Sequence, residues 1–239
     1  MELIRANGRK LQDIRAIDIS MNPIKYADGS ATFKIGNTSV VAYVQGPHEI
    51  LSKKGKYTDK GILNVKFFMT NFSTPQHKTN VKKNIRMTEF GNLLKSVFEG
   101  VILLKNYQNS QIDLHICVLE NDGGYKSAAF NAATLALVDA GISLSQYVVS
   151  MNSGFLESFT PAIDLQQTEE KKHNCDFLIS YLPKTKKIAF IELDSKKLSI
   201  KEVNSLVELA IEGCMHINEI IDQYIRENIE NNLHYFAYE

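Results

Sequence analysis

The chain has 239 residues, its formal net charge is zero, and 44% of its residues are hydrophobic. This composition suffices for a packed core in one domain or two small ones, and no run of 18 apolar residues suggests a membrane-spanning helix. The three cysteines, Cys117, Cys175 and Cys214, are odd in number and widely spaced, which argues against a zinc site or a disulfide framework and favours a reducing compartment.

The first half of the chain predicts strands followed by a helix. A hairpin is expected between Ala31 and Val44, where two β-rich runs flank the two-residue turn Gly36-Asn37. A further strand is predicted for 62–70 and a polar loop for 71–84. Apolar residues that recur every three or four positions predict an amphipathic helix over 88–105.

The second half predicts a strand over 112–119, an alanine-rich helix over 128–140, and a strand, turn and strand around Gly154. A charged turn is expected at 168–175, and a second hairpin from runs 177–182 and 188–193. A long helix is predicted from about 198 to 229. This order of elements predicts an α+β fold with helices on one side of mixed sheets.

The junction between strand 112–119 and the following helix is the most informative stretch. Gly123 and Gly124 allow backbone N–H groups to approach a ligand, the helix N-terminus adds partial positive charge, and Lys126 adds a full charge. These features suit a bound phosphate. The alternative is that the two glycines simply form a tight turn.

The neutral net charge hides an asymmetry along the chain. Between 51 and 86 only Asp59 opposes nine basic residues, which are Lys53, Lys54, Lys56, Lys60, Lys66, Lys78, Lys82, Lys83 and Arg86. Such a cluster favours a polyanion such as a nucleic acid, because binding releases counterions. The alternative is a solvated surface segment without a partner.

An ordered set of short motifs resembles the RNase PH family and, more narrowly, the eukaryotic exosome ring subunit whose archaeal counterpart is phosphorolytic. The resemblance extends from about Leu3 to Ile225 and rests on Asn7-Gly8-Arg9, Ala27-Asp28-Gly29-Ser30-Ala31, Gly36-Asn37-Thr38, Gly46-Pro47-His48-Glu49-Ile50, Asp122-Gly123-Gly124, Asn131-Ala132-Ala133-Thr134-Leu135-Ala136, Asp139-Ala140-Gly141-Ile142 and Ile163-Asp164-Leu165.

The resemblance implies one RNase PH-type domain over 1–239, with a fold like ribosomal protein S5 domain 2. It implies a six-membered ring through which RNA threads, with other RNase PH-type subunits and S1/KH cap subunits as partners and no membrane. In active members inorganic phosphate attacks the terminal phosphodiester, and Mg²⁺ is a further candidate cofactor. The implied location is the nucleus, including the nucleolus, and the cytoplasm.

The resemblance also suggests site residues, several of which depart from the active pattern. Phosphate is expected at Gly123, Gly124, Lys126, Ser127 and Arg86, but Tyr125 and Lys126 replace a small hydroxyl residue and an arginine. Lysine lacks the two-pronged grip of arginine on phosphate.

The paired catalytic aspartates of active members fall on Glu170 and Asp176, and Asp176 is also a candidate metal ligand. Alternatively, Glu170 belongs to a charged turn and Asp176 merely starts a strand. RNA contacts are expected from Lys60, Arg86, Lys82, Lys83, Lys53 and Lys54, in the basic loops 51–61 and 71–86. We therefore expect a ring subunit that guides RNA with an eroded phosphorolytic site, and the alternative is an active phosphate-dependent exoribonuclease.

Overall fold

The computed structural model describes residue 5 and residues 8–50, 59–73, 85–156, 160–173, 175–194 and 198–236. A five-stranded sheet has the order β1-β2-β3-β5-β4, in which only β4 and β5 run parallel. Its strands are β1 (Ile17–Met21), β2 (Gly29–Ile35), β3 (Thr38–Glu49), β4 (Ile62–Met69) and β5 (Ser110–Glu120).

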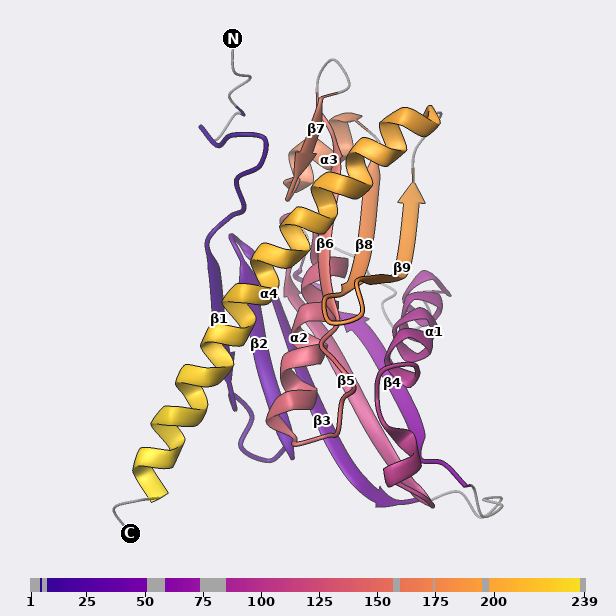
Figure 1. The fold of residues 1–239 in the computed structure, drawn as a ribbon, viewed down its shortest axis with the longest axis vertical. Coiled ribbons are helices and arrows are strands. Elements are labelled where there is room, and N and C mark those ends of the chain that lie inside the picture. The colour runs from indigo at the N-terminus through magenta and orange to yellow at the C-terminus, as the bar shows by residue number, and fades with distance from the viewer. Residues whose placement is uncertain are drawn as a thin grey trace.

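A second, antiparallel sheet has the order β7-β6-β8-β9. Its strands are β6 (Val149–Phe155), β7 (Pro161–Ile163), β8 (Asp176–Leu182) and β9 (Lys187–Asp194). The helices are α1 (Ile85–Glu99), the short 3₁₀ helix η1 (Leu104–Asn106), α2 (Tyr125–Asp139), α3 (Gln167–His173) and α4 (Ile200–Phe236). Figure 1 shows α4 crossing the second sheet and α1 lying beside β4.

Helix α2 lies between the two sheets. It packs against β2 and β3 on one side and against β6 on the other, and eleven consecutive residues, Ser127–Leu137, are buried. Alanines along the helix permit this close packing, and Phe130 contacts rings from both sides of the core. A helix that is buried all round must be apolar all round, which explains why α2 has no polar face.

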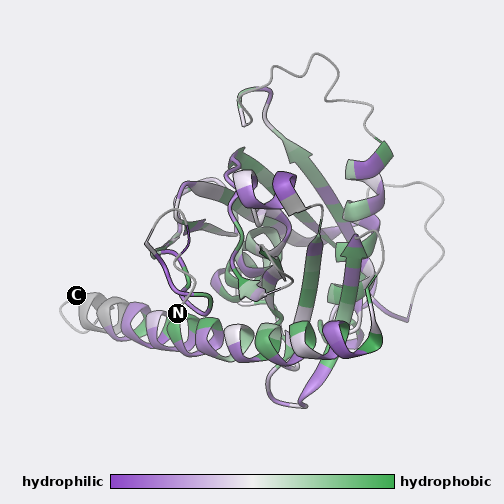
Figure 2. Cartoon of the chain, turned by 90° about the horizontal axis from the view of Figure 1, so that it is seen from above, coloured by the Kyte–Doolittle hydropathy of each residue, from purple (hydrophilic) through white to green (hydrophobic). Residues whose placement is uncertain are grey.

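The second sheet carries helices on both faces, so the expectation of helices on one side was wrong. Met151 of β6 lies against Gly213 of α4, whereas its neighbour Asn152 lies beside Gly124 at the start of α2. Adjacent residues of a strand point to opposite faces, which places α2 and α4 on opposite sides. Figure 2 shows hydrophobic residues concentrated in the strands and both hydrophobic and hydrophilic residues along α4.

Several sequence predictions are confirmed. The pairing of Ile35 with Thr38 confirms the two-residue hairpin turn, in which Gly36 has φ +57°. The strand at 62–70, the second hairpin and the α+β class are also confirmed. No described helix has the length and apolar character needed to cross a membrane.

Other predictions were wrong in detail. The charged turn expected at 168–175 is largely helix α3, and the helix expected over 88–105 ends at Glu99. Gly154 is not a turn residue, because it lies in β6 and pairs with Ala162 of β7. The final helix extends to Phe236, and β1 was not predicted.

Candidate functional site

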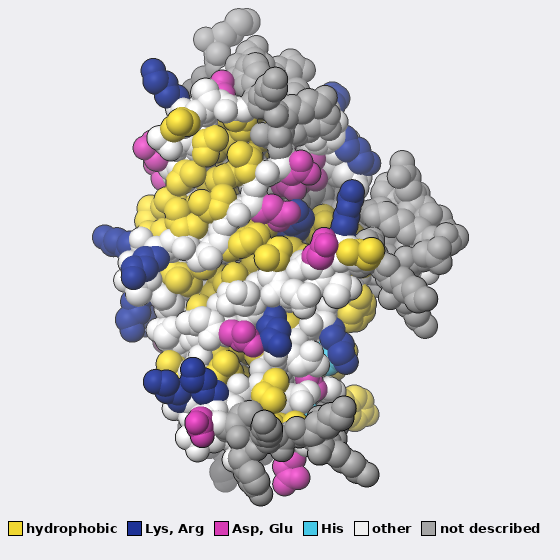
Figure 3. Space-filling view, turned by 90° about the vertical axis from the view of Figure 1, so that its right-hand side faces the viewer, with side chains coloured by type: hydrophobic (Ala, Val, Ile, Leu, Met, Phe, Trp, Pro, Cys, Tyr) yellow, Lys and Arg dark blue, Asp and Glu magenta, His cyan; other side chains and the backbone are white. Residues whose placement is uncertain are grey.

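A cavity of about 540 Å³ lies among β4, α1, the start of α2, β8 and β9. One wall is apolar and includes Phe67, Phe90 and Tyr125, whose rings contact one another through Phe67. Of the described residues around the cavity, two are basic and four are acidic, namely Arg86, Lys126, Glu89, Asp176, Glu192 and Asp194. Figure 3 shows acidic and basic side chains gathered beside exposed hydrophobic surface on this side of the molecule.

The cavity brings together three residues that the sequence assigned to one site. Lys126 at the start of α2, Arg86 at the start of α1 and Asp176 at the start of β8 all line it. These three residues therefore lie around one cavity. Their roles in binding or catalysis stay predictions.

Sequence reasoning missed Glu192 and Asp194 of β9. The register pairs Asp176 with Asp194 and Leu178 with Glu192, so β9 delivers both acids to the cavity beside Asp176. Alternation along β9 was the available signal, since residues two apart share a face. Nothing in the sequence alone states which face borders the cavity.

Lys126 forms ion pairs with Glu192 and Asp176. Its Nζ lies 2.8 Å from Glu192 Oε1 and 3.8 Å from Asp176 Oδ2. Burial acts to lower the pKa of Lys126, but the hydrogen bond that Lys126 donates to Glu192 and the charge of Asp176 outweigh it, and the pKa is raised. Lys126 is therefore a charged ammonium that already has anionic partners.

Asp176 is buried enough for its own protonation to change. Burial raises the pKa of Asp176, and the charge of Glu192 raises it further, while Lys126 opposes the shift. The raised pKa means that this carboxyl binds a proton more readily than an ordinary aspartate does. This geometry is compatible with the catalytic role predicted for Asp176 and does not test it.

Glu170 is not part of a solvated charged turn. It lies on α3, and its Oε1 accepts hydrogen bonds from the backbone N–H of Gly124 at 2.9 Å and from Nδ2 of Asn152 at 2.8 Å. Burial, followed by the charge of Asp176, raises the pKa of Glu170 to about 7. The side chain thus bridges α3 to the start of α2.

The glycine pair is fixed by contacts within the protein. At Gly123 (φ +91°), an added Cβ would lie 2.4 Å from the carbonyl oxygen of Leu165. The carbonyl oxygen of Gly123 accepts from Thr38 Oγ1 at 2.7 Å and from Arg15 Nη2 at 3.1 Å. Glycine is therefore needed at 123 because the backbone at Leu165 lies too close to leave room for a side chain.

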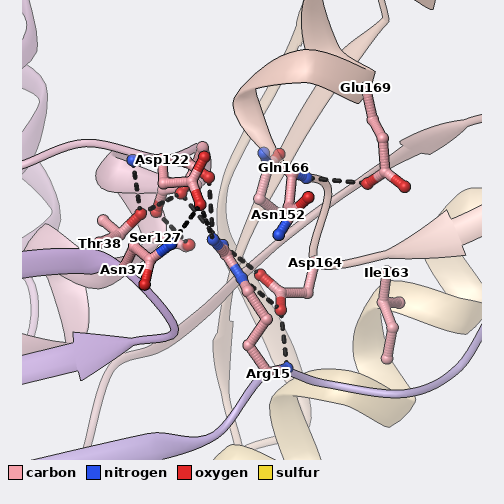
Figure 4. Close-up of polar contacts among 12 residues, drawn as sticks. Arg15, Asn37, Thr38, Asp122, Ser127, Asn152, Ile163, Asp164, Gln166 and Glu169 are labelled. Atoms are coloured by element: carbon pink, nitrogen blue, oxygen red, sulfur yellow. Dashed lines mark hydrogen bonds and ion pairs between the residues drawn. The ribbon is translucent and has the colours of Figure 1, made fainter. Parts of the chain in front are cut away.

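Arg15 links this loop to the turn after β7, as Figure 4 shows. Its guanidinium donates to both carboxylate oxygens of Asp164, at 2.8 and 2.6 Å, and to the carbonyl oxygen of Asp122 at 2.8 Å. Asp164 has φ +52°, and Arg5 and Arg9 also donate to it. Through Arg15, Asp164 therefore stabilises the loop at 122–124, which leads into α2.

Ser127 and Tyr125 both contact neighbouring parts of the protein. Ser127 is buried, and its hydroxyl donates to the carbonyl oxygen of Gly124 at 2.8 Å, so it is engaged inside the first turn of α2. Tyr125 packs on Phe67, and burial raises the pKa of its phenol. The ring of Tyr125 therefore forms part of the cavity wall.

Of the predicted RNA-contacting residues, the structure describes Lys60 and Arg86. Lys60 lies just before β4, whereas Phe67 and Met69 near the other end of this strand line the cavity. At about 3.3 Å per residue, the ends of β4 are roughly 23 Å apart, so Lys60 lies well away from Arg86 and the cavity. The remaining predicted residues, Lys53, Lys54, Lys82 and Lys83, lie outside the described residues.

The structure offers no ready metal site in the part of the chain that it describes. No group of three or more His, Cys, Asp or Glu side chains there is arranged to hold a metal ion. Lys126 instead lies against both Asp176 and Glu192. Magnesium binding at Asp176 stays a prediction.

A family model that matches more than half of the chain defines its class. Residues 13–143 match the RNase PH model, described as the 3′ exoribonuclease family, domain 1, and the chain belongs to this family. Among curated proteins, it is 38% identical to the Arabidopsis thaliana exosome complex component RRP41 homolog over 228 residues, covering 95% of this chain and 93% of the relative. It is 32% identical to the Homo sapiens exosome complex component RRP41, covering 94% and 91% of the two chains.

Solved structures agree on the fold. Rice Rrp46 superposes with a TM-score of 0.79 at 25% identity, covering 91% of this chain and 98% of that chain. An Archaeoglobus fulgidus exosome with RNA bound to its active site superposes with a TM-score of 0.77, covering 90% and 91%. At 19% identity, this second likeness shows the fold alone.

Proposed function

We propose that the chain is a core ring subunit of an exosome, of the eukaryotic RRP41 type, that binds and guides RNA for 3′-to-5′ processing and degradation. The observation that carries the proposal is similarity to exosome components over nearly the whole chain. The proposed partners are RNA, other RNase PH-type ring subunits and S1/KH cap subunits. Ribosomal-RNA processing in the nucleus, with the nucleolus, and activity in the cytoplasm belong to the same proposal.

The phosphorolytic site is proposed to be eroded. Phosphorolysis requires a phosphate to be held by cationic and N–H donors close to another phosphodiester. Here Lys126 replaces arginine and contacts two carboxylates, and Gly124 N–H contacts Glu170. The described lining of the cavity also holds more acids than bases. These contacts support the loss of phosphate binding at this site.

A second function, a phosphate-dependent 3′-to-5′ exoribonuclease that releases nucleoside diphosphates, is favoured by one observation. Arg86, Lys126 and Asp176 line one cavity, as a residual phosphorolytic site would require. In this reading inorganic phosphate is a co-substrate, and Asp176 with its raised pKa acts as the proton donor to the leaving oxygen.

One experiment separates the two functions. A ring that contains this chain and no hydrolytic subunit is assembled and incubated with RNA and phosphate. We expect RNA binding without release of nucleoside diphosphates. Release that depends on phosphate and stops in Asp176→Asn would establish the second function. Failure of the chain to co-sediment with ring subunits and RNA would contradict both functions.

A further inference from the structure

Two donors suited to phosphate are already engaged by carboxylates of this chain. One is Nζ of Lys126, which lies 2.8 Å from Glu192. The other is the backbone N–H of Gly124, which lies 2.9 Å from Glu170. Both donors are at the start of α2, where the helix dipole favours an anion, and no side chain caps this helix.

Glu192 is held by Lys126 in a specific way. Its Oε1 takes the ion pair, while its Oε2 is buried and has no hydrogen-bond partner among the described residues. The side chain as a whole is only partly buried, and the contact with Lys126 holds Oε1 at the cavity wall. The ammonium in turn has Glu192 and Asp176 as its anions.

Glu170 is held at the backbone N–H of Gly124 by two hydrogen bonds. Oε1 receives both the Gly124 N–H and the Asn152 amide, and Asn152 is buried. The Oε1 of Glu170 therefore occupies the backbone N–H of Gly124 at the N-terminus of α2. The two carboxylates come from different elements, β9 and α3.

We propose that the chain carries internal substitutes for phosphate, with Glu192 on Lys126 and Glu170 on the Gly124 N–H, and that these two contacts exclude inorganic phosphate from the start of α2. This inference deepens the proposed function, because it names the residues that keep the cavity from acting as a phosphate site. Glu192 is then a specificity-determining residue that the family motifs do not reveal.

The test is titration of the purified full-length chain with inorganic phosphate at constant ionic strength, followed by calorimetry. Glu192→Gln keeps the shape of the side chain and removes its charge, which breaks the shorter ion pair of Lys126 and leaves Asp176 at 3.8 Å. We expect this variant to bind phosphate about 10- to 100-fold more tightly than the wild type, the range for a charge-assisted contact. Equal affinities of variant and wild type would overturn the proposal.

Two matched variants locate the effect. Lys126→Met added to Glu192→Gln should abolish the gain, and a gain that persists would contradict the role of Lys126. Glu208→Gln makes the same change of charge on the exposed face of α4 and should leave phosphate binding at the wild-type level. An equal increase in phosphate affinity in Glu208→Gln and Glu192→Gln would show that only net charge matters, and it would overturn the proposal.

The role of Glu170 is tested by adding Glu170→Ala to Glu192→Gln, which frees the Gly124 N–H. A further rise in phosphate affinity would support the proposal that Glu170 blocks this N–H. An unchanged affinity would contradict that role of Glu170.

The wild-type chain provides a measurement that needs no variant. Phosphate at matched ionic strength should raise its melting temperature no more than chloride does, since a ligand that binds only the folded state would raise it. A specific rise with phosphate would overturn the proposal. These measurements involve neither RNA nor ring partners, so their failure leaves the ring-subunit proposal standing, and failure of ring assembly leaves them interpretable.

Discussion

Arg15 and Asp164 form a two-point ion pair that ties the segment before β1 to the turn after β7. Arg15 Nε lies 2.8 Å from Asp164 Oδ2, and Nη2 lies 2.6 Å from Oδ1. Both side chains are almost fully buried. Because Arg15 also donates to the carbonyl oxygens of Asp122 and Gly123, the pair supports the loop that precedes α2.

Asp164→Asn should destabilise the protein by about 3–5 kcal/mol, because it leaves the guanidinium of Arg15 buried without its anion. Urea unfolding measures the change. The control is Lys34→Met, which breaks the exposed ion pair with Asp18 and should cost less than about 1 kcal/mol. If Asp164→Asn unfolds at the wild-type urea concentration, the pair does not stabilise the fold.

Gly123→Ala should be far more destabilising than Gly141→Ala, although both glycines have positive φ. At Gly123 a Cβ would lie 2.4 Å from the Leu165 carbonyl oxygen, whereas nothing lies within 4 Å at Gly141. We expect Gly141→Ala to cost about 1–2 kcal/mol from the left-handed backbone alone. Gly123→Ala adds a backbone clash to that cost, and equal melting temperatures of the two variants would disprove the close approach.

The stability of the protein should fall with rising pH through Glu170. Its pKa is about 7 in the folded protein against a model value of 4.5, so the folded state binds the proton more tightly than the unfolded state. This contribution is fully present below about pH 4.5 and is lost as the pH rises through about 7. Its upper limit is roughly 3 kcal/mol.

Glu170→Gln keeps an oxygen to accept from Gly124 and Asn152 but cannot titrate. The difference in unfolding free energy between wild type and Glu170→Gln should therefore decrease between pH 5 and about 7. Urea unfolding at several pH values measures it, with Glu208→Gln as an exposed control. Parallel wild-type and Glu170→Gln profiles would show that Glu170 does not titrate in this range.

Replacement of Lys60 and Arg86 by glutamate should weaken RNA binding by an assembled ring. Backbone-directed contacts depend on salt, so each lost phosphate contact should reduce the slope of log affinity against log salt by about one. Filter binding at several salt concentrations and crosslinking measure the effect. Lys201→Glu on α4 is the control, and unchanged affinity and crosslinking in the double variant would contradict the RNA-channel prediction.

The sequence predicted the elements whose signals are local. The Gly36-Asn37 turn lies between two β-rich runs, and turn chemistry of this kind depends on the residues themselves. Helix α3 was missed because its seven residues are polar and lack apolar periodicity. Its position depends on Arg5, which lies 164 residues away from Glu169 and contacts it from the N-terminal segment.

The candidate site was predictable only in part, for a similar reason. Lys126 stood out because it follows the glycine pair, and Asp176 because the family resemblance places a catalytic aspartate there. Glu192 became visible only through the register of β8 with β9, which no local pattern determines. The actual partners of the glycine loop, Arg15 and Leu165, likewise come from distant segments.

Helix α2 packs against both sheets and so connects the two halves of the chain. The matched family segment ends at residue 143, just beyond this helix, whereas the second sheet is built from residues 149–194. A fragment that stopped at residue 143 would keep the five-stranded sheet and yet expose the alanine-rich side of α2 to water. We therefore expect the two sheets to unfold cooperatively, because loss of either sheet would expose a buried face of α2 to water.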